Sequence, residues 1–232
     1  MNDFLITGIK SGLGKYLHIN IPGSQGLSRV NFDSLSEEGY NTIVHCAFNK
    51  EYPITDYKKY MEDNIFLTQK LKALPHKYFV YISTVDVYQT SPTVYALFKR
   101  FAESLLDSYD LILRCPMMFG DTMKPNHATK LKANIGRIGI SGESTFNYIL
   151  MQDILRFITT GDYRHYSGVI DFVSEDIIEL KEVKRYFNST IELGVDLYTN
   201  SMSNYKNPIF NLDSTYRSKS YENLVKYFSK YD

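Results

Sequence analysis

The sequence predicts an α/β fold with a doubly wound parallel sheet, and three observations support this. Apolar runs of strand length recur along the first half of the chain. Longer segments with helical apolar spacing separate them, which is the alternation that parallel strands and helical crossovers produce. The central runs are continuously apolar, as expected for strands covered on both faces. The expected strands are residues 4–7, 42–47, 78–83 and 111–113, and the expected helices are residues 56–74 and 95–108.

The pattern loosens after Arg114, where glycine, proline, asparagine and lysine become frequent. Regular spacing returns at residues 146–160, 168–172 and 180–187, and residues 221–231 are expected to form a helix. A chain of 232 residues usually folds as one compact unit. We therefore predict a main part, residues 1–114, and a small C-terminal lobe, residues 115–232, that also returns strands to the main sheet.

Composition and charge exclude several classes of protein. The 26 Lys and Arg residues balance the 26 Asp and Glu residues, and no basic run suited to a phosphate backbone is present, so a nucleic-acid partner is not expected. Cys46 and Cys115, the two cysteines, lie in apolar strand-like contexts and are expected to be buried thiols in a reducing compartment. We find neither a signal-peptide pattern nor an apolar run of about 20 residues, and expect a cytoplasmic protein without a membrane partner.

A glycine-rich turn follows the first expected strand and opens a helix. Glycines at positions 8, 12 and 14 let the backbone turn sharply and approach a pyrophosphate, which N–H groups at the helix start then bind. This predicts a Rossmann-like dinucleotide site, although a glycine-rich turn without a ligand is the alternative. We therefore assign cofactor binding to residues 1–114 and substrate binding to the lobe formed by residues 115–232. The expected cofactor contacts in this turn are Gly8, Lys10, Ser11, Gly12, Leu13 and Gly14.

The end of the second strand usually selects between the two dinucleotides. An acidic residue there pairs with the free ribose hydroxyl, and a basic one accepts a 2′-phosphate. Ser28 and Arg29 occupy this place, and no acid follows until Asp33. We therefore expect NADP as the cofactor, with NAD as the alternative if Arg29 is only a surface charge.

Three polar side chains follow downstream in an order suited to carbonyl chemistry. Thr84 ends a buried strand, and Tyr95 and Lys99 are four residues apart, which places them on one face of a helix. A phenol needs a neighbouring cation to work as an acid or base near neutral pH, and Lys99 is the expected cation. Thr84 is expected to hold the substrate oxygen. These three are the candidate catalytic residues, and no metal site is expected.

In these motifs the chain resembles the short-chain dehydrogenase/reductase superfamily, especially its extended branch of nucleotide-sugar epimerases, dehydratases and ketoreductases. Further matches are residues 44–47, Asn64, residues 81–84 with 87–88, Glu103 and residues 113–120. The resemblance implies that Tyr95 is the acid/base and that Lys99 also contacts the nicotinamide ribose. The further cofactor contacts it implies are Cys46, Ala47, Phe48, Asn64, Ser83, Tyr95, Lys99, Pro116 and Met117.

The chain departs from the extended branch in several places. The glycine spacing is that of the shorter, classical branch, the connection between residues 29 and 42 is short, and only six residues separate Tyr88 from Tyr95. Met117 stands where many of these enzymes have Asn, and Phe146 or its neighbours stand where an Arg often holds the diphosphate. The alternatives for the diphosphate are Lys130, Lys132 and Arg137, which equally fit a solvated surface.

The expected function is therefore an NADP-dependent oxidoreductase that reduces a keto group of a sugar, with a nucleotide-linked 4-keto sugar as substrate and polysaccharide biosynthesis as setting. A nucleotide-sugar 4-epimerase that retains NAD is one alternative. A dinucleotide-binding sensor or scaffold without catalysis is another. Dehydration is disfavoured, because Val85 and Asp86 supply one carboxylate where a pair is needed.

A homodimer is a further expectation from the resemblance. In the related enzymes the helix with Tyr-x-x-x-Lys and the helix before it often pair between subunits. The candidate contact residues are Phe98, Phe101 and Leu105 on the later helix and Ile65, Phe66 and Leu71 on the earlier one. Packing against the sheet is the alternative for all six.

Overall fold

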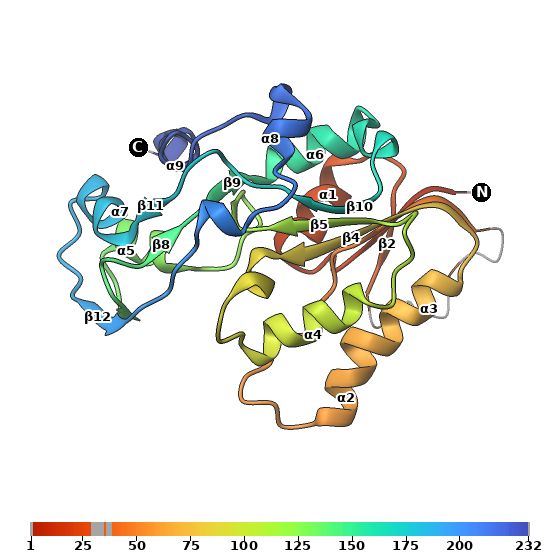
Figure 1. The fold of residues 1–232 in the computed structure, drawn as a ribbon, viewed down its shortest axis with the longest axis horizontal. Helices are drawn as coiled ribbons and strands as arrows, with labels where there is room; N and C mark the ends of the chain where they lie inside the picture. The colour runs from red at the N-terminus through yellow and green to blue at the C-terminus, as the bar shows by residue number, and fades with distance from the viewer. Residues whose placement is uncertain (1, 29–34, 36–38, 232) are drawn as a thin grey trace.

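A six-stranded parallel sheet forms the centre of the molecule (Figure 1). The computed structural model describes residues 2–28, 35 and 39–231. The strands are β1 (Asn2–Thr7), β2 (Gln25–Leu27), β3 (Tyr40–His45), β4 (His76–Thr84), β5 (Leu111–Cys115) and β10 (Gly168–Asp171). Their spatial order is β10-β5-β4-β3-β1-β2, and every neighbouring pair is parallel. This is the doubly wound α/β sheet that the sequence predicts.

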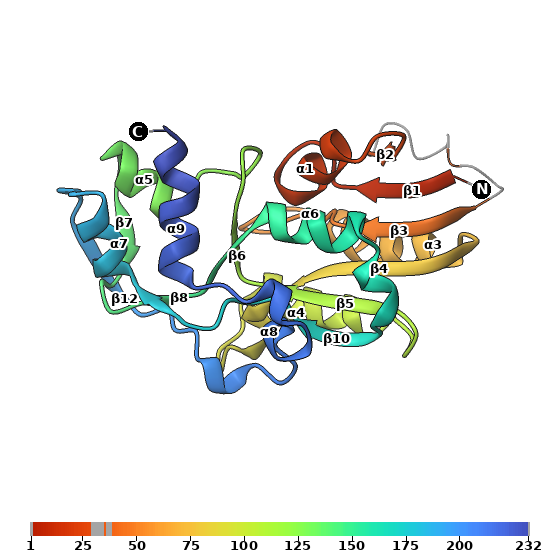
Figure 2. The ribbon, with the colours of Figure 1, turned by 90° about the horizontal axis from the view of Figure 1, so that it is seen from above.

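Helices cover both faces of this sheet (Figure 2). One face carries α1 (Gly12–Asn20) and α6 (Met151–Thr159), which contact each other. The opposite face carries α2 (Tyr57–Met61), a π-helical turn η2 (Glu62–Phe66), α3 (Leu67–Ala73) and α4 (Val94–Glu103). Leu13 and Leu17 of α1 join one apolar core, and Ile65 and Leu71 join the other. Residues 42–45 of β3 and 79–84 of β4 are therefore buried, as expected for central strands covered on both faces.

The C-terminal residues form a lobe beside the carboxyl ends of the sheet strands (Figure 2). Its short strands pair as β6 (Met117–Phe119) with β9 (Tyr148–Leu150), β7 (Ile138–Ile140) with β12 (Leu193–Asp196), and β8 (Thr145–Phe146) with β11 (Ile178–Glu179). Its helices are α5 (His127–Ala133), α7 (Leu180–Tyr186) and α9 (Ser220–Phe228). Phe119, Tyr148 and Phe228 pack in its core through ring contacts.

Short elements complete the described chain. They are α8 (Ile209–Leu212) and the 3-10 turns η3 (Val85–Tyr88), η4 (Asp162–His165), η5 (Met202–Asn204), η6 (Ser214–Tyr216) and η7 (Ser229–Tyr231). No helix among the described residues has the length and apolar character that a membrane crossing requires. The division of the chain at residue 114 stays a prediction, while β10, from the second half, pairs with β5 in the main sheet.

Two expected elements end earlier than predicted, each for a local reason. The strand expected at residues 42–47 ends at His45, because the N–H groups of Cys46 and Ala47 donate to Thr7 Oγ1 at 3.0 and 2.9 Å. The helix expected to reach residue 108 ends at Glu103. Beyond it, Leu105 N–H bonds three residues back to the Ala102 carbonyl, which tightens the chain into a turn.

Candidate active site

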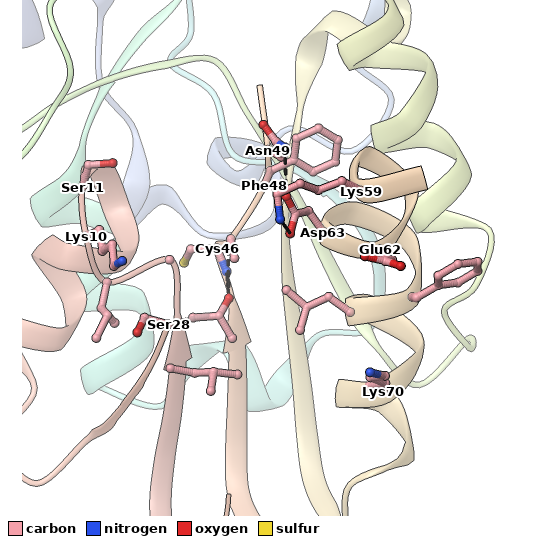
Figure 3. Close-up of a pocket in the computed structure, with 17 residues that line it drawn as sticks. Lys10, Ser11, Ser28, Cys46, Phe48, Asn49, Lys59, Glu62, Asp63 and Lys70 are labelled. Carbon is pink, nitrogen blue, oxygen red and sulfur yellow. Dashed lines mark hydrogen bonds and ion pairs between the residues drawn. The ribbon is translucent and has the colours of Figure 1, made fainter. Parts of the chain in front are cut away.

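The strand order reverses direction between β1 and β3, and a cavity lies at this point. In open α/β sheets, ligands bind beside the carboxyl ends of strands where the order reverses. A cavity of about 850 Å³ lies there, and Figure 3 shows it between the β1–α1 turn on one side and the α2–α3 helix on the other. We call it the first cavity. Its lining includes Gly8, Lys10, Ser11, Ser28, Cys46, Ala47, Phe48, Asn49, Lys59, Glu62, Asp63 and Lys70.

Two of the predicted glycines are required by close backbone contacts. Gly8 has φ +76°, and a Cβ there would lie 3.0 Å from the Ala47 nitrogen at the end of β3. A Cβ on Gly14 would lie 2.3 Å from the Thr7 carbonyl oxygen, which is far inside van der Waals contact. The turn thus brings the start of α1 against both central strands, as a dinucleotide cradle requires.

The start of α1 also contacts the second half of the chain. Gly12 N–H donates to the Thr122 carbonyl at 2.7 Å, and the Thr122 hydroxyl donates to the Gly12 carbonyl at 2.7 Å. The first N–H groups of a helix have no partner within the helix, and that of Gly12 is bonded to Thr122 instead. We infer that a pyrophosphate at this turn relies on the remaining N–H groups or displaces Thr122.

Ser28, one of the two residues expected to select NADP, lies in the wall of the first cavity. Lys10 and Ser28 both line it, on the side of α1 and β2 (Figure 3). Arg29 lies outside the described residues, so the expectation that it contacts a 2′-phosphate stays a prediction. The facing helix contributes charges of both signs, with Lys59 and Lys70 beside Glu62 and Asp63.

A second cavity of about 550 Å³ adjoins the first and shares Ser11, Cys46 and Phe48 with it. It lies between the carboxyl ends of β4 and β5 and the C-terminal lobe. The predicted site residues that line it are Ser11, Gly12, Leu13, Gly14, Cys46, Phe48, Ser83, Thr84, Tyr95, Lys99, Pro116 and Met117. Sequence reasoning therefore collected residues from five separate segments that the fold brings to one cavity.

Tyr95 lies near the start of α4, where the Thr93 side chain caps the helix by accepting from Ala96 N–H. Burial is the largest effect on its phenol and raises its pKa above the ordinary value, and the nearby Asp86 raises it further. Lys50 and the Thr84 hydroxyl oppose this shift. The sequence predicts that Lys99 is the cation that favours the phenolate, but burial has the larger effect and the pKa of the phenol is raised.

Lys99 lies one turn after Tyr95 but points into the protein. Its Nζ donates to the Ile82 carbonyl at 2.6 Å and lies 4.4 and 4.5 Å from the ring centroids of Phe48 and Tyr81. Its side chain is 3% exposed, and this burial, aided by the charge of Lys50, lowers its pKa to about 7. Lys99 nevertheless lies in the wall of the second cavity beside Phe48, where it borders the space open to a ligand.

Asn64, which the resemblance assigns to the cofactor, is fully buried and lines neither cavity. It lies in the π-helical turn η2, and its amide bonds both the N–H and the carbonyl of Asn49, at 2.6 and 3.1 Å. The structure therefore places Asn64 behind the loop that follows β3. Its effect on a ligand is to fix this loop, which carries Phe48 and Lys50.

A buried ion pair supports the site from behind. Arg114 at the end of β5 bonds Glu103 through Nε at 3.1 Å and Nη2 at 2.6 Å, and Ser83 Oγ donates to the same carboxylate at 2.5 Å. Arg114 also donates to Tyr88 OH, which in turn donates to Asp171 in β10. This network joins α4, β4, β5 and β10 directly behind Thr84.

Several residues that line the second cavity were missed by sequence reasoning. They are Lys50, Lys124, Asn126, Tyr198 and Asn200, together with Asp86, which we had considered only for dehydration. Tyr198 donates to Asp86 at 2.6 Å, which joins the lobe to the end of β4. The sequence signal for Lys50 is its position, since it is a charged residue shortly after a central strand, where ligands bind in such sheets. The lobe residues gave no comparable signal, because the chain returns to the cavity from far along the sequence.

The basic residues suggested for a diphosphate lie elsewhere. Lys130 donates to the Arg137 carbonyl, Lys132 donates to the Phe228 carbonyl, and neither these lysines nor Arg137 line the described cavities. The surface alternative therefore fits them better. Phe146 does line the second cavity, but it is buried and stacked on Tyr198 with ring centroids 5.0 Å apart.

Both cysteines are free thiols, Cys115 buried and Cys46 partly buried. Within the described ranges, no group of three or more His, Cys, Asp and Glu side chains is arranged to hold a metal ion.

Comparisons with known proteins show likeness in structure. No model of a known protein family matches the sequence, and no curated protein matches it either. A UDP-glucuronic acid 4-epimerase from Bacillus cereus, solved with UDP-glucuronic acid and NAD, has a TM-score of 0.72 at 16% identity. The likeness covers 98% of this chain and 99% of that chain. A dTDP-4-dehydrorhamnose reductase from Bacillus anthracis, in complex with NADP, has a TM-score of 0.70 at 16% identity, covering 99% and 98%.

A UDP-N-acetylglucosamine 4-epimerase from Methanobrevibacter ruminantium M1 gives a TM-score of 0.71 at 18% identity, over 99% of this chain and 98% of that chain. The fold that the resemblance implies is thus confirmed over nearly the whole chain.

Proposed function

We propose that this protein is an NADP-dependent oxidoreductase that reduces a keto group of a sugar, with a nucleotide-linked sugar as substrate. The observation that carries the proposal is the convergence of Thr84, Tyr95 and Lys99 on one cavity that continues into the glycine turn. A scaffold that only binds dinucleotide does not need this set of three side chains. The solved proteins of like fold include one reductase bound to NADP and two nucleotide-sugar 4-epimerases.

The cradle fits a dinucleotide. The backbone at Gly8 and Gly14 packs closely against the ends of β1 and β3. The adjoining first cavity is large enough for the adenosine half of a dinucleotide. Lys10 and Ser28 would hold the adenosine side, and Lys99, Pro116 and Met117 would border the nicotinamide side. When bound in reduced form, the cofactor supplies a hydride to the carbonyl carbon.

Tyr95 is the proposed acid. Its hydroxyl gives a proton to the carbonyl oxygen, so that the ketone becomes a secondary alcohol and Tyr95 is left as a phenolate until solvent returns the proton. Thr84, a residue 6% exposed at the end of β4, would hold the same oxygen by a hydrogen bond from its hydroxyl.

The substrate would enter from the lobe side of the second cavity. Lys50 and Lys124 contribute positive charge there, and Asn126 and Asn200 contribute amide groups suited to sugar hydroxyls. In this proposal Lys124 would face the phosphates, and not Lys130 and Lys132 of α5 or Arg137 before β7. A cytoplasmic place and a role in polysaccharide biosynthesis accord with such a substrate.

Nucleotide binding tests the proposal most directly. We expect the purified protein to be stabilised against heat by NADPH more than by NADH, because ligand binding to the native state raises the melting temperature. Mass spectrometry of denatured protein should find little bound nucleotide. Tightly held NAD would instead support the 4-epimerase alternative. Indifference to both nucleotides would contradict the oxidoreductase proposal.

The choice of NADP gives a separate prediction at Arg29. Arg29→Ala should weaken NADPH binding by about 1.5 to 3 kcal/mol, since a charge-assisted hydrogen bond to the 2′-phosphate is lost. NADH binding should change little. Titration of both nucleotides by calorimetry measures the difference, and equal weakening of the two would refute the assignment.

We also propose that two copies of this chain form a dimer. Ile65 and Leu71 are buried in the core, so those two are not contact residues, and Phe98 and Leu105 pack partly against the same core. Phe66 and Phe101 are 44% and 46% exposed, and Leu97, one turn before Phe101, is 47% exposed. We propose that the exposed side of α4, with Leu97 and Phe101 at its centre, pairs with a second copy of this chain.

Phe101→Glu should therefore convert a dimer to a monomer in analytical ultracentrifugation, because it places a charge in the paired apolar surface. Val195→Glu is the matched control, since Val195 is 90% exposed but lies on β12 in the lobe. A parent protein that sediments as a monomer at high concentration would exclude this interface.

A further inference from the structure

The ammonium group that lies on the Tyr95 ring belongs to Lys50. Lys50 Nζ is 4.1 Å from the centroid of the Tyr95 ring, and both residues line the second cavity. Lys99, which the spacing on α4 had suggested as the partner, instead bonds the Ile82 carbonyl at 2.6 Å. The cation at the phenol therefore comes from the loop after β3.

The backbone on both sides of Lys50 is fixed, although the lysine itself is exposed. Asn49 N–H donates to Asn64 Oδ1 at 2.6 Å, and Glu51 N–H donates to Asn49 Oδ1 at 2.9 Å. The Asn49 side chain also donates to Asp63 at 2.9 Å. The π-helical turn that contains Asp63 and Asn64 thus determines where the Lys50 side chain begins, which limits the entropy lost when it reaches Tyr95.

Groups from several elements act on the Tyr95 phenol. The charged ones are Lys50 after β3 and Asp86 after β4, and Thr84 adds a hydrogen bond. Asp86 raises the pKa of the phenol while Lys50 lowers it, and the effect of Lys50 is the larger of the two. The phenols of Tyr60 and Tyr81 also lie close enough for Tyr95 to affect them.

We propose that Lys50 is a positioning residue for Tyr95: its ammonium holds the phenol in place and stabilises the phenolate that remains after proton transfer. Lys99 is then left to contact the cofactor from the cavity wall. The inference rests on the proposed function only for its use in catalysis, because the contact of Lys50 with Tyr95 exists without cofactor or substrate.

The ionisation of Tyr95 tests the proposal without any turnover. All tyrosines are replaced by 3-fluorotyrosine, whose phenol ionises at lower pH than that of tyrosine, and fluorine NMR follows each resonance against pH. The Tyr95 resonance is identified by its loss in Tyr95→Phe. In Lys50→Met its midpoint should rise by about 0.7 to 3 pH units, the range expected for removing one charge about 4 Å away, from the screening of bulk water to that near a protein surface. Lys50→Arg should keep the midpoint near that of the parent.

Lys59→Met is the control, because Lys59 is also an exposed lysine on this side of the sheet but lies in the first cavity, 3.9 Å from Asp63. It should leave the Tyr95 midpoint in place. An unchanged midpoint in Lys50→Met overturns the proposal, as does an equal rise in Lys59→Met. A rise in Lys99→Met alone would return the role to Lys99. If NADPH failed to bind, the proposed function would fall while this titration still decided the role of Lys50.

Discussion

Tyr95→Phe should slow the reduction of a suitable keto sugar by roughly 100-fold to 10,000-fold, the usual contribution of a positioned acid or base. The change removes one oxygen and keeps the ring. That ring makes an edge contact with Phe48, with centroids 5.2 Å apart, and this contact survives the substitution. Folding and NADPH binding should therefore be retained. Single-turnover measurements at saturating cofactor isolate the chemical step.

Thr84→Val provides a companion variant. It removes a hydroxyl that faces the same cavity and should lower kcat with little change in nucleotide affinity. Full turnover in Tyr95→Phe would mean that the Tyr-x-x-x-Lys spacing is coincidental. The non-catalytic dinucleotide-binding protein would then become the better account of the three converging side chains.

The sheet and its helices were predictable because each depends on local patterning. Residues 79–82 are apolar at every position, and residues 42–45 have two apolar residues between Thr42 and His45. Short runs of this kind between helical segments are typical of central parallel strands covered on both faces. The glycine turn was predictable for a similar reason, since Gly14 has no room for a side chain against Thr7. Ends of elements were less predictable. For example, β3 ends before residues 46 and 47 because their N–H groups bond the hydroxyl of Thr7, a residue far away in the sequence.

The candidate site was predictable as a set of residues but not as a set of contacts. The spacing of Tyr95 and Lys99 correctly placed both on α4 and in one cavity. It did not show that Lys99 turns toward Ile82, because that direction depends on the carbonyl at the end of β4 and on the rings of Phe48 and Tyr81. Helical periodicity sets where a side chain starts, whereas tertiary packing sets where its polar end lies.

Lys99→Met should stabilise the protein near neutral pH while impairing its function. Burial lowers the pKa of Lys99 to about 7 in the folded protein, against an ordinary value of 10.5. Between these two pH values the unfolded chain carries a proton at this lysine that the folded protein lacks. The stability of the parent therefore rises as the pH increases from about 7 to about 10.5, and below pH 7 it carries the full cost of this burial, on the order of a few kcal/mol.

Methionine removes the ionisation and keeps a side chain of similar length, so the variant should unfold at a higher temperature than the parent at pH 6 to 7. The difference should shrink steadily toward pH 10. NADPH affinity and turnover should both fall, because the ammonium group proposed to contact the cofactor is gone. Melting curves from pH 6 to 10 measure the first effect and nucleotide titration measures the second.

Lys15→Met is the matched control, since Lys15 is an exposed lysine on α1 and should give parallel curves. A Lys99→Met protein that is less stable than the parent at pH 7 would show that the buried lysine is charged and well paired, contrary to the lowered pKa.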